Sequence, residues 1–387
     1  MDKRVYWIWL QQALKYGNYK IKYICDLYKN DIESFFKAKE RDWRLCGFFT
    51  NNDIDALNSS SIESAQQIFE QCYRLSYDIV VPFDGIYPDN LWHIANPPAV
   101  LYVLGNSSVL KSKIKIAVVG TRNASFAGEQ VAEEVAKRAA TSGAIVVSGG
   151  ALGIDSAAHR GAINAEKPTI AVLGCGINFN YLSQNSRLRY RISKHGALIS
   201  EYPPDTSAHN YNFPMRNRII SGLSVATIVV EAGQKSGSLI TANLANDQGR
   251  DVFVVPLNVN GALCSGARTL LEDGAKIVTH IEDLVEYYKY KHDSFPNIID
   301  NEYNNSEKLS SDFGVKNHQD KQNKIENYNL SPNTKACYKL FCQHKKLYID
   351  KISELLNLDI KYILASLTEL ELYGLIRVCP GKFYEIL

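Results

Sequence analysis

Apolar and polar positions follow two alternating patterns through the middle of the chain. Seven short apolar runs lie between residues 113 and 280, among them IKIAVVG, TIAVLGCG and ATIVVEA. Stretches such as AGEQVAEEVAKRAATSG separate these runs and space their apolar residues as one face of a helix does. Runs that are apolar throughout predict strands covered on both faces, and their alternation with helices predicts a mostly parallel sheet. We therefore expect an α/β, doubly wound, Rossmann-like domain here.

The flanking segments have different patterns. Residues 1–80 show helical spacing interrupted by polar breaks, which predicts a small helical domain before the sheet domain at 81–285. Residues 286–330 are polar, rich in asparagine and poor in aliphatic side chains, which predicts a disordered linker. Residues 331–387 return to three helical periods followed by a short pair of strands. This order is typical of a winged-helix domain.

Composition narrows the class of protein. Apolar residues make up 45% and charged residues 22% of the chain, no apolar run is long enough to cross a bilayer, and no signal peptide is evident. The 8 cysteines are scattered, without a CxxC pair or a cluster at zinc-ligand spacing, which favours reduced thiols. We expect a cytoplasmic protein with no membrane association, no metal site and no cofactor.

Charge is uneven along the chain although the formal net charge is only +2. Residues 101–280 contain 18 Lys and Arg against 12 Asp and Glu, whereas the remainder contains 25 against 29. The basic excess thus coincides with the predicted sheet domain. It supports an anionic partner for that domain.

Glycine-rich loops follow the first three predicted strands of this domain. They read GTRNAS, SGGALGID and GCGIN, and a similar turn, EAGQKSGS, follows a later strand. Glycine lets backbone N–H groups approach an anion, and the start of the following helix adds partial positive charge. No loop completes the dinucleotide-binding GxGxxG pattern and no P-loop sequence occurs, so tight turns alone are the alternative. Because a parallel sheet brings these loops to one edge, we expect one crevice there.

The side chains expected at this crevice are basic or hydroxyl-bearing, and few are acidic. The stretch FPMRNRIISG at 213–222 either begins a core helix or forms a surface that binds an anion. Asp155 and His159 stand one helical turn apart. They could form a catalytic pair, but a helix cap and a packing histidine explain the same spacing.

Six motifs, in order and spacing, resemble the DNA processing protein A (DprA) family. They read VVGTRNASFAG, VSGGALGIDSAAH, TIAVLGCGIN, LISEYP, FPMRNRIISGLS and VVEAGQKSGSLITANLANDQGRDVFVVP. The resemblance is strong over residues 84–280 and looser in the flanks, where it implies a sterile-alpha-motif-like helical domain and a winged helix. It implies a homodimeric, non-enzymatic protein that binds single-stranded DNA without sequence preference. Such a protein protects incoming DNA and loads RecA recombinase on it in natural transformation or recombination.

The resemblance also implies the DNA-binding residues. In the family, an arginine after the first strand and an FPxRNR segment line a basic pocket for the DNA backbone and an unstacked base. With the glycine-rich loops, the predicted site is Gly120, Thr121, Arg122, Ser148, Gly149, Gly150, Gly153, Phe213, Arg216, Asn217, Arg218, Lys235, Ser236, Gly237, Ser238 and Thr241. Two departures from the family pattern lie nearby: Asn210 replaces a frequent lysine, and Leu182 replaces a proline.

Two other functions fit parts of the sequence. The same Rossmann variant resembles that of nucleotide phosphoribohydrolases of the lysine-decarboxylase-like group, which carry a PGGxGTxxE motif. In this chain EAGQKSGSLITA stands at that place and supplies no glutamate after the glycines. A transcriptional regulator led by the winged helix would need a basic recognition helix. The candidate, IKYILASLTELELYG, has one basic residue, Lys361, and two glutamates, which is more typical of a protein-binding or structural helix.

Overall fold

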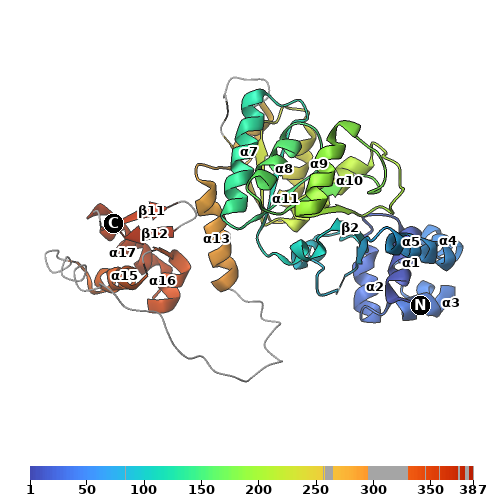
Figure 1. The fold of residues 1–387 in the computed structure, drawn as a ribbon. Coiled ribbons are helices and arrows are strands. Elements are labelled where there is room, and N and C mark those ends of the chain that lie inside the picture. Colours follow the sequence, from blue (N-terminus) through green and yellow to red (C-terminus); the bar gives the residue numbers. More distant parts are fainter. Residues whose placement is uncertain are drawn as a thin grey trace, which may run out of the picture. The chain divides into compact units, whose positions relative to one another are not determined.

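A computed structural model describes residues 1–82, 84–255, 257, 265–294, 330–344, 346–356, 358–373, 375–379 and 383–386. The chain divides into two compact units, Met1–Ile281 and Glu282–Leu387. Figure 1 shows the first as a sheet with helices on both faces and the second as a small helical bundle with a short sheet. None of the described helices is both long enough and apolar enough to span a membrane.

Among the described residues, the first unit is built on a nine-stranded sheet in the order β1-β2-β6-β5-β4-β3-β7-β8-β9. The strands from β3 to β9 run parallel, and β1 and β2 form an antiparallel edge next to β6. Their bounds are β1 (Asp78–Val80), β2 (Leu101–Gly105), β3 (Lys115–Gly120), β4 (Ile145–Ser148), β5 (Thr169–Leu173), β6 (Ala197–Ser200), β7 (Ala226–Val230), β8 (Asp251–Val254) and β9 (Lys276–Ile277). The prediction of a doubly wound, mostly parallel sheet is confirmed.

Helices cover both faces of this sheet. One face carries α7 (Phe126–Thr141), α8 (Ile154–Asn164) and α9 (Ser186–His195), and the other carries α6 (Asp89–Trp92), α10 (Asn212–Leu223), α11 (Gly237–Asp247) and α12 (Ser265–Glu272). Strand β5 shows the division, since Leu173 packs with Ile192 of α9 while Val172 packs with Ile219 of α10. Each such side chain contributes about 1.5–3 kcal/mol through burial.

The path of the chain through the sheet places the site. From β3 the chain winds through β4 and β5 to β6, and then returns to β7 on the other side of β3. The connections after β3 and β7 therefore leave toward opposite faces of the sheet. This is the switch point at which doubly wound sheets open a crevice beside the carboxyl ends of their strands.

The N-terminal helices surround α1 and share a core with the sheet. They are α1 (Lys3–Leu14), α2 (Lys20–Tyr28), α3 (Ile32–Leu45), α4 (Asn51–Ser59) and α5 (Ile62–Arg74). Trp9 lies in one apolar cluster with Ile79 of β1 and Tyr102 of β2. The segment predicted to be helical is thus helical, but it packs with the sheet as one unit, and β1 already begins within residues 1–80.

The second unit contains α13 (Ile281–Ser294), α15 (Pro332–Gln343), β10 (Lys346–Tyr348), α16 (Ile349–Leu356), α17 (Ile360–Leu372), β11 (Ile376–Cys379) and β12 (Phe383–Ile386). Its described strands form an antiparallel sheet in the order β10-β12-β11, as in a winged helix. The linker prediction was wrong at its start, because α13 continues through 286–294. Buried Ile281, Val285 and Tyr288 recur at helical spacing and explain this helix. Residues 295–329 lie outside the described part.

Candidate nucleic-acid interface

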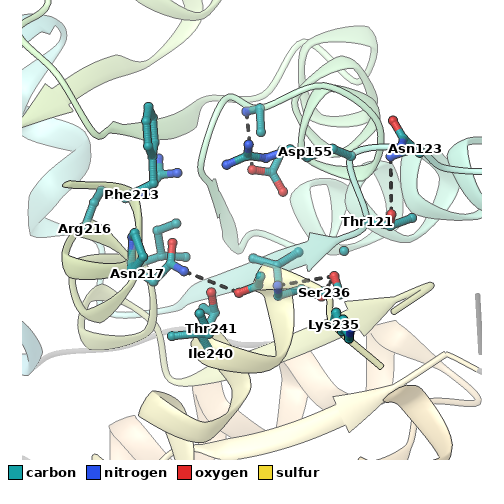
Figure 2. Close-up of a pocket in the computed structure, with 18 of the residues that line it drawn as sticks. Thr121, Asn123, Asp155, Phe213, Arg216, Asn217, Lys235, Ser236, Ile240 and Thr241 are labelled. Atoms are coloured by element: carbon teal, nitrogen blue, oxygen red, sulfur yellow. Dashed lines mark hydrogen bonds between the residues drawn. The ribbon is translucent and has the colours of Figure 1, made fainter. Parts of the chain in front are cut away.

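A pocket of about 500 Å³ lies at the switch point, beside the carboxyl ends of β3 and β7. The loop after β3, the start of α10 and the turn before α11 form its walls. Figure 2 shows Phe213 and Asn217 of α10 on one side of the pocket, and Ser236 and Thr241 on another. Of the predicted residues, those that line it are Gly120, Thr121, Arg122, Phe213, Arg216, Asn217, Lys235, Ser236, Gly237, Ser238 and Thr241.

Phe213 is held from several directions in this pocket. The Arg122 guanidinium lies over the ring, 5.6 Å from its centroid. The Tyr181 ring lies 4.8 Å from the Phe213 ring, centroid to centroid, at an interplanar angle of 36°. Gly174 lies beneath it, where an added Cβ would be 2.6 Å from Phe213 Cδ1. Phe213 nevertheless stays half-exposed, so it packs against the fold and also presents aromatic surface to the pocket.

The turn before α11 has features that favour an anion and lines the same pocket as Phe213. Ser236 is the N-cap of α11, and its hydroxyl lies 2.7 Å from that of Ser238. The Asn217 amide donates a hydrogen bond of 3.4 Å to the Gly237 carbonyl and so joins α10 to this turn. Lys235 is exposed at the mouth. A lysine next to the first turn of a helix, with its unpaired N–H groups, favours a phosphate there.

Arg216 lies in the wall of the pocket, and the protein itself uses much of its guanidinium. Only 4% of the residue is exposed. Its Nη1 donates to the carbonyls of Gly149, at 2.7 Å, and Val172. Burial lowers the pKa of Arg216, and the nearby Asp155 carboxylate opposes that shift. The structure therefore gives Arg216 a role in joining α10 to the ends of β4 and β5.

The structure places Arg218 outside the pocket, contrary to the prediction. Its side chain is 3% exposed, and its Nη2 donates to both oxygens of Glu201 at 2.6 Å. The Gly17 N–H also donates to Glu201, at 3.4 Å. Arg218 lies five positions beyond Phe213, about 140° around the helix, so it points into the protein when Phe213 faces the pocket.

The second glycine-rich loop contributes Ala151 and Asp155 to the pocket, while its four predicted residues lie behind them. Ser148 is fully buried and its hydroxyl donates to the Val118 carbonyl at 2.7 Å. Gly153 has a φ of +71°, and an added Cβ there would lie 2.5 Å from the Thr121 oxygen. Gly149 and Gly150 line only a small hollow of about 20 Å³ beside Arg122. These four predicted residues therefore support the pocket from behind. At Gly153 the close approach of the backbone requires glycine.

The acidic side chains Asp155 and Glu231 are held by the fold, and Asp155 also lines the pocket. The Asp155 carboxylate accepts hydrogen bonds from the Gly149 and Ala151 N–H groups at 3.1 and 3.3 Å, and burial raises its pKa while Arg216 lowers it. Glu231 accepts hydrogen bonds from the backbone and hydroxyl of Ser125, the N-cap of α7. The N-terminus of α7 is therefore already neutralised by a protein carboxylate. Within the described part of the chain, no group of three or more His, Cys, Asp or Glu could hold a metal ion.

His159 is a packing residue. It is fully buried, its Nδ1 lies 2.8 Å from the Thr169 hydroxyl, and that hydroxyl donates to the Val146 carbonyl. Burial, with the Arg216 charge adding to it, lowers the pKa of His159 to about 3. The imidazole is thus neutral at pH 7. The packing interpretation of the Asp155 and His159 spacing agrees with these contacts, and the catalytic one does not.

Acidification should destabilise the fold through His159. The histidine takes up a proton near pH 6.5 in the unfolded chain but only near pH 3 in the folded one, so stability falls as pH decreases between these values. From pH 7 to pH 4 we expect a loss of roughly 3 kcal/mol from this residue. Denaturant unfolding of the wild type and His159→Leu at both pH values measures it. Equal losses in the two proteins would contradict the assignment.

Some pocket residues were not predicted. Tyr181 is the most prominent, and Asn123, Asn210, Pro214, Ile220 and Ile240 also line the wall. The sequence did contain a signal for Tyr181: it is an aromatic residue in the loop after the third predicted strand, and that loop lies at the same edge of the sheet as the pocket. Leu182, next to it, has a φ of +56°, a conformation that proline cannot adopt. The replacement of the family's proline by Leu182 is therefore accompanied by a backbone conformation that proline could not adopt.

Comparison with known proteins identifies the family. Residues 78–289 match the family model described as DNA recombination-mediator protein A, and residues 343–382 match the DprA winged helix domain. The chain belongs to the DprA family. The predicted family and the winged helix are thereby confirmed. This description is that of a recombination mediator, which agrees with the non-enzymatic prediction and not with the phosphoribohydrolase alternative.

Several DprA relatives are similar over half of the chain or more. DNA processing protein DprA of Bacillus subtilis is 44% identical over 200 residues, which are 52% of this chain and 67% of that protein. Its counterpart in Streptococcus pneumoniae is 40% identical over 207 residues, or 54% of this chain and 73% of the relative. Protein Smf of Borreliella burgdorferi is 32% identical over 286 residues, or 74% and 86%.

Two solved DprA structures have a similar fold. The X-ray structure of DprA from Streptococcus pneumoniae has a TM-score of 0.64 at 32% identity, covering 72% of this chain and 95% of that one. The Helicobacter pylori protein, described for its single-stranded DNA binding mode, has a TM-score of 0.50 at 30% identity, covering 56% and 96%.

Proposed function

We propose that this DprA-family protein binds single-stranded DNA, without sequence preference, in the pocket at the switch point. The observation that carries the proposal is the half-exposed Phe213 ring, with the Arg122 guanidinium over it, in a pocket that the α11 turn also lines. An aromatic face stacks any base, because every base has a π-face, and the cations bind the backbone that all sequences share. The described binding mode of the Helicobacter pylori relative supports it.

Each element of the pocket has a part in this binding. Arg122 is exposed and can hold a phosphate through paired N–H donors. Lys235 and the first turn of α11 offer a second phosphate site in the same pocket. Arg216 positions α10, on which Phe213 stands. A duplex keeps its bases stacked inside, so it cannot place one on Phe213.

The wider role rests on the family. We propose that the protein protects incoming single strands and loads RecA recombinase on them in natural transformation or another recombination process, acting as a cytoplasmic homodimer. The family description as a recombination mediator and the DNA-processing names of the relatives support this role.

Purified protein should bind single-stranded oligonucleotides more tightly than duplexes of the same sequence. Affinity should fall steeply with salt, by about 0.7 in the log–log slope per phosphate contact on single strands. Fluorescence anisotropy titrations with several sequences at several salt concentrations measure both. Equal affinity for duplex and single strand would refute the pocket as the binding site.

A further inference from the structure

One helix of the first unit exposes a basic and aromatic face that the pocket does not use. Helix α9, SRLRYRISKH, contains no acidic residue. Arg187, Tyr190, Arg191 and Lys194 stand at positions i, i+3, i+4 and i+7, so they share one face of the helix. We call these four residues the α9 strip.

The side chains of the α9 strip are available for a partner. Arg187 and Lys194 are exposed, Arg191 is half-exposed, and Tyr190 is 64% exposed. None of the three cations forms an ion pair with a residue that the structure describes. Arg191 makes only a long hydrogen bond of 3.4 Å to Asn164, and Lys194 lies over the Tyr190 ring, 5.4 Å from its centroid.

A fourth arginine on the same helix shows the contrast. Arg189 donates to the carbonyls of Ile177, Phe179 and Tyr181, at 2.8, 3.1 and 3.2 Å, and so holds the loop that carries Tyr181 to the pocket. The fold therefore uses the cation on the inner side of α9. It leaves those of the strip without a structural task.

The strip begins two residues after Asn185, which contacts the rim of the small hollow beside Arg122. The Asn185 amide, just before α9, donates to the Gly150 carbonyl at 3.1 Å and to the Ser156 hydroxyl at 2.9 Å. Gly150 lines the small hollow that Tyr181 and Phe213 also line. From Arg187 to Lys194 the strip extends about 10 Å along the helix. Figure 1 shows α9 on the outside of the sheet, in agreement with the exposed or half-exposed side chains of the strip.

We propose that a single strand leaving the pocket continues along the α9 strip, with its phosphates on Arg187, Arg191 and Lys194 and a base against Tyr190. This inference rests on the proposed function and extends its binding site. Cations interleaved with an aromatic side chain form the kind of track that binds single strands without reading their sequence. Short oligonucleotides fill the pocket alone, whereas longer ones also reach the strip.

The test compares oligothymidines of roughly 6 and 25 nucleotides, the first near the lower end of the range of about 4–16 nucleotides for one such site and the second beyond its upper end. In the triple variant Arg187→Ala, Arg191→Ala and Lys194→Ala, the salt slope for the long strand should fall by about 2, at about 0.7 per cation. Near 0.1 M salt this corresponds to roughly a tenfold to hundredfold loss of affinity. Affinity for the short strand should stay unchanged.

A matched control removes the same charge elsewhere. Lys3, Lys37 and Lys137 are exposed on α1, α3 and α7, and their triple alanine variant should keep the wild-type affinity for the long strand. Equal loss in both variants, or no loss in the strip variant, would overturn the strip while wild-type binding still supports the pocket. Failure of the wild type to bind either strand would instead overturn the proposed function.

A second variant tests the aromatic member of the strip. Tyr190→Leu keeps a large apolar side chain on this exposed turn and removes the stacking face. The long strand should bind several-fold more weakly with an unchanged salt slope, and the short strand equally well. A change in the short-strand affinity would show that α9 acts on the pocket through the fold, and would overturn the track.

Discussion

Arg218→Met should destabilise the fold by about 3–5 kcal/mol, because it leaves the Glu201 carboxylate buried without its partner. The pair is 3% and 2% exposed, and Glu201 accepts both hydrogen bonds of 2.6 Å from one guanidinium nitrogen. The pair also joins α10 to the loop between α1 and α2 through Gly17. Thermal or denaturant unfolding measures the loss.

The double variant Glu201→Gln with Arg218→Met separates a structural pair from a DNA contact. Removing both charges avoids the isolated buried carboxylate, so the double variant should be more stable than Arg218→Met alone. Where it folds, it should bind single strands with nearly the affinity and salt slope of the wild type. If Arg218→Met is as stable as the wild type but binds single strands with a smaller salt slope, Arg218 contacts DNA and the structural assignment is wrong.

The fold could be predicted because its strands are apolar throughout. Runs such as IAVVG and ATIVV have one stable environment, a sheet covered on both faces, and the helices between them fix parallel connections. The loops that follow parallel strands must meet at one edge, which is why Arg122 and Lys235 were predicted together, whereas Phe213 was added from the resemblance to the family. No detailed geometry was needed for that step.

The roles of individual arginines could not be predicted in the same way. A sequence shows that 216 and 218 are basic, but the partner of each depends on tertiary contacts: the Gly149 and Val172 carbonyls for Arg216, and the Glu201 carboxylate for Arg218. Helical spacing did contain part of the answer, since it separates Arg218 from Phe213 by about 140°.

The start of the linker was mispredicted for a related reason. Composition over 286–330 is polar overall, but the apolar residues Ile281, Val285 and Tyr288 recur at helical spacing across its first boundary. Val285 and Tyr288 are buried on α13, and their burial outweighs the polar neighbours. Local periodicity was the better guide there, because only one face of a helix needs to be apolar.

Phe213→Leu should weaken single-strand binding by about 1–3 kcal/mol, the usual contribution of one base–aromatic stack, without changing the salt slope. Leucine keeps apolar volume between Gly174 and Tyr181 and removes the aromatic face, so the melting temperature should stay close to that of the wild type. Phe213→Ala should lose the same affinity and also stability, because it leaves a space beside Tyr181 and Gly174.

Arg122→Ala is the matched change of charge at the same place. It removes an exposed cation that lies over the Phe213 ring, so all oligonucleotides should bind more weakly and the salt slope should fall by about 0.7. Titrations of Phe213→Leu, Phe213→Ala and Arg122→Ala at several salt concentrations, together with their melting curves, distinguish the contribution of stacking from that of charge. If Phe213→Leu binds as tightly as the wild type, the ring serves only to hold the start of α10, and the phosphate contacts alone account for binding in the pocket.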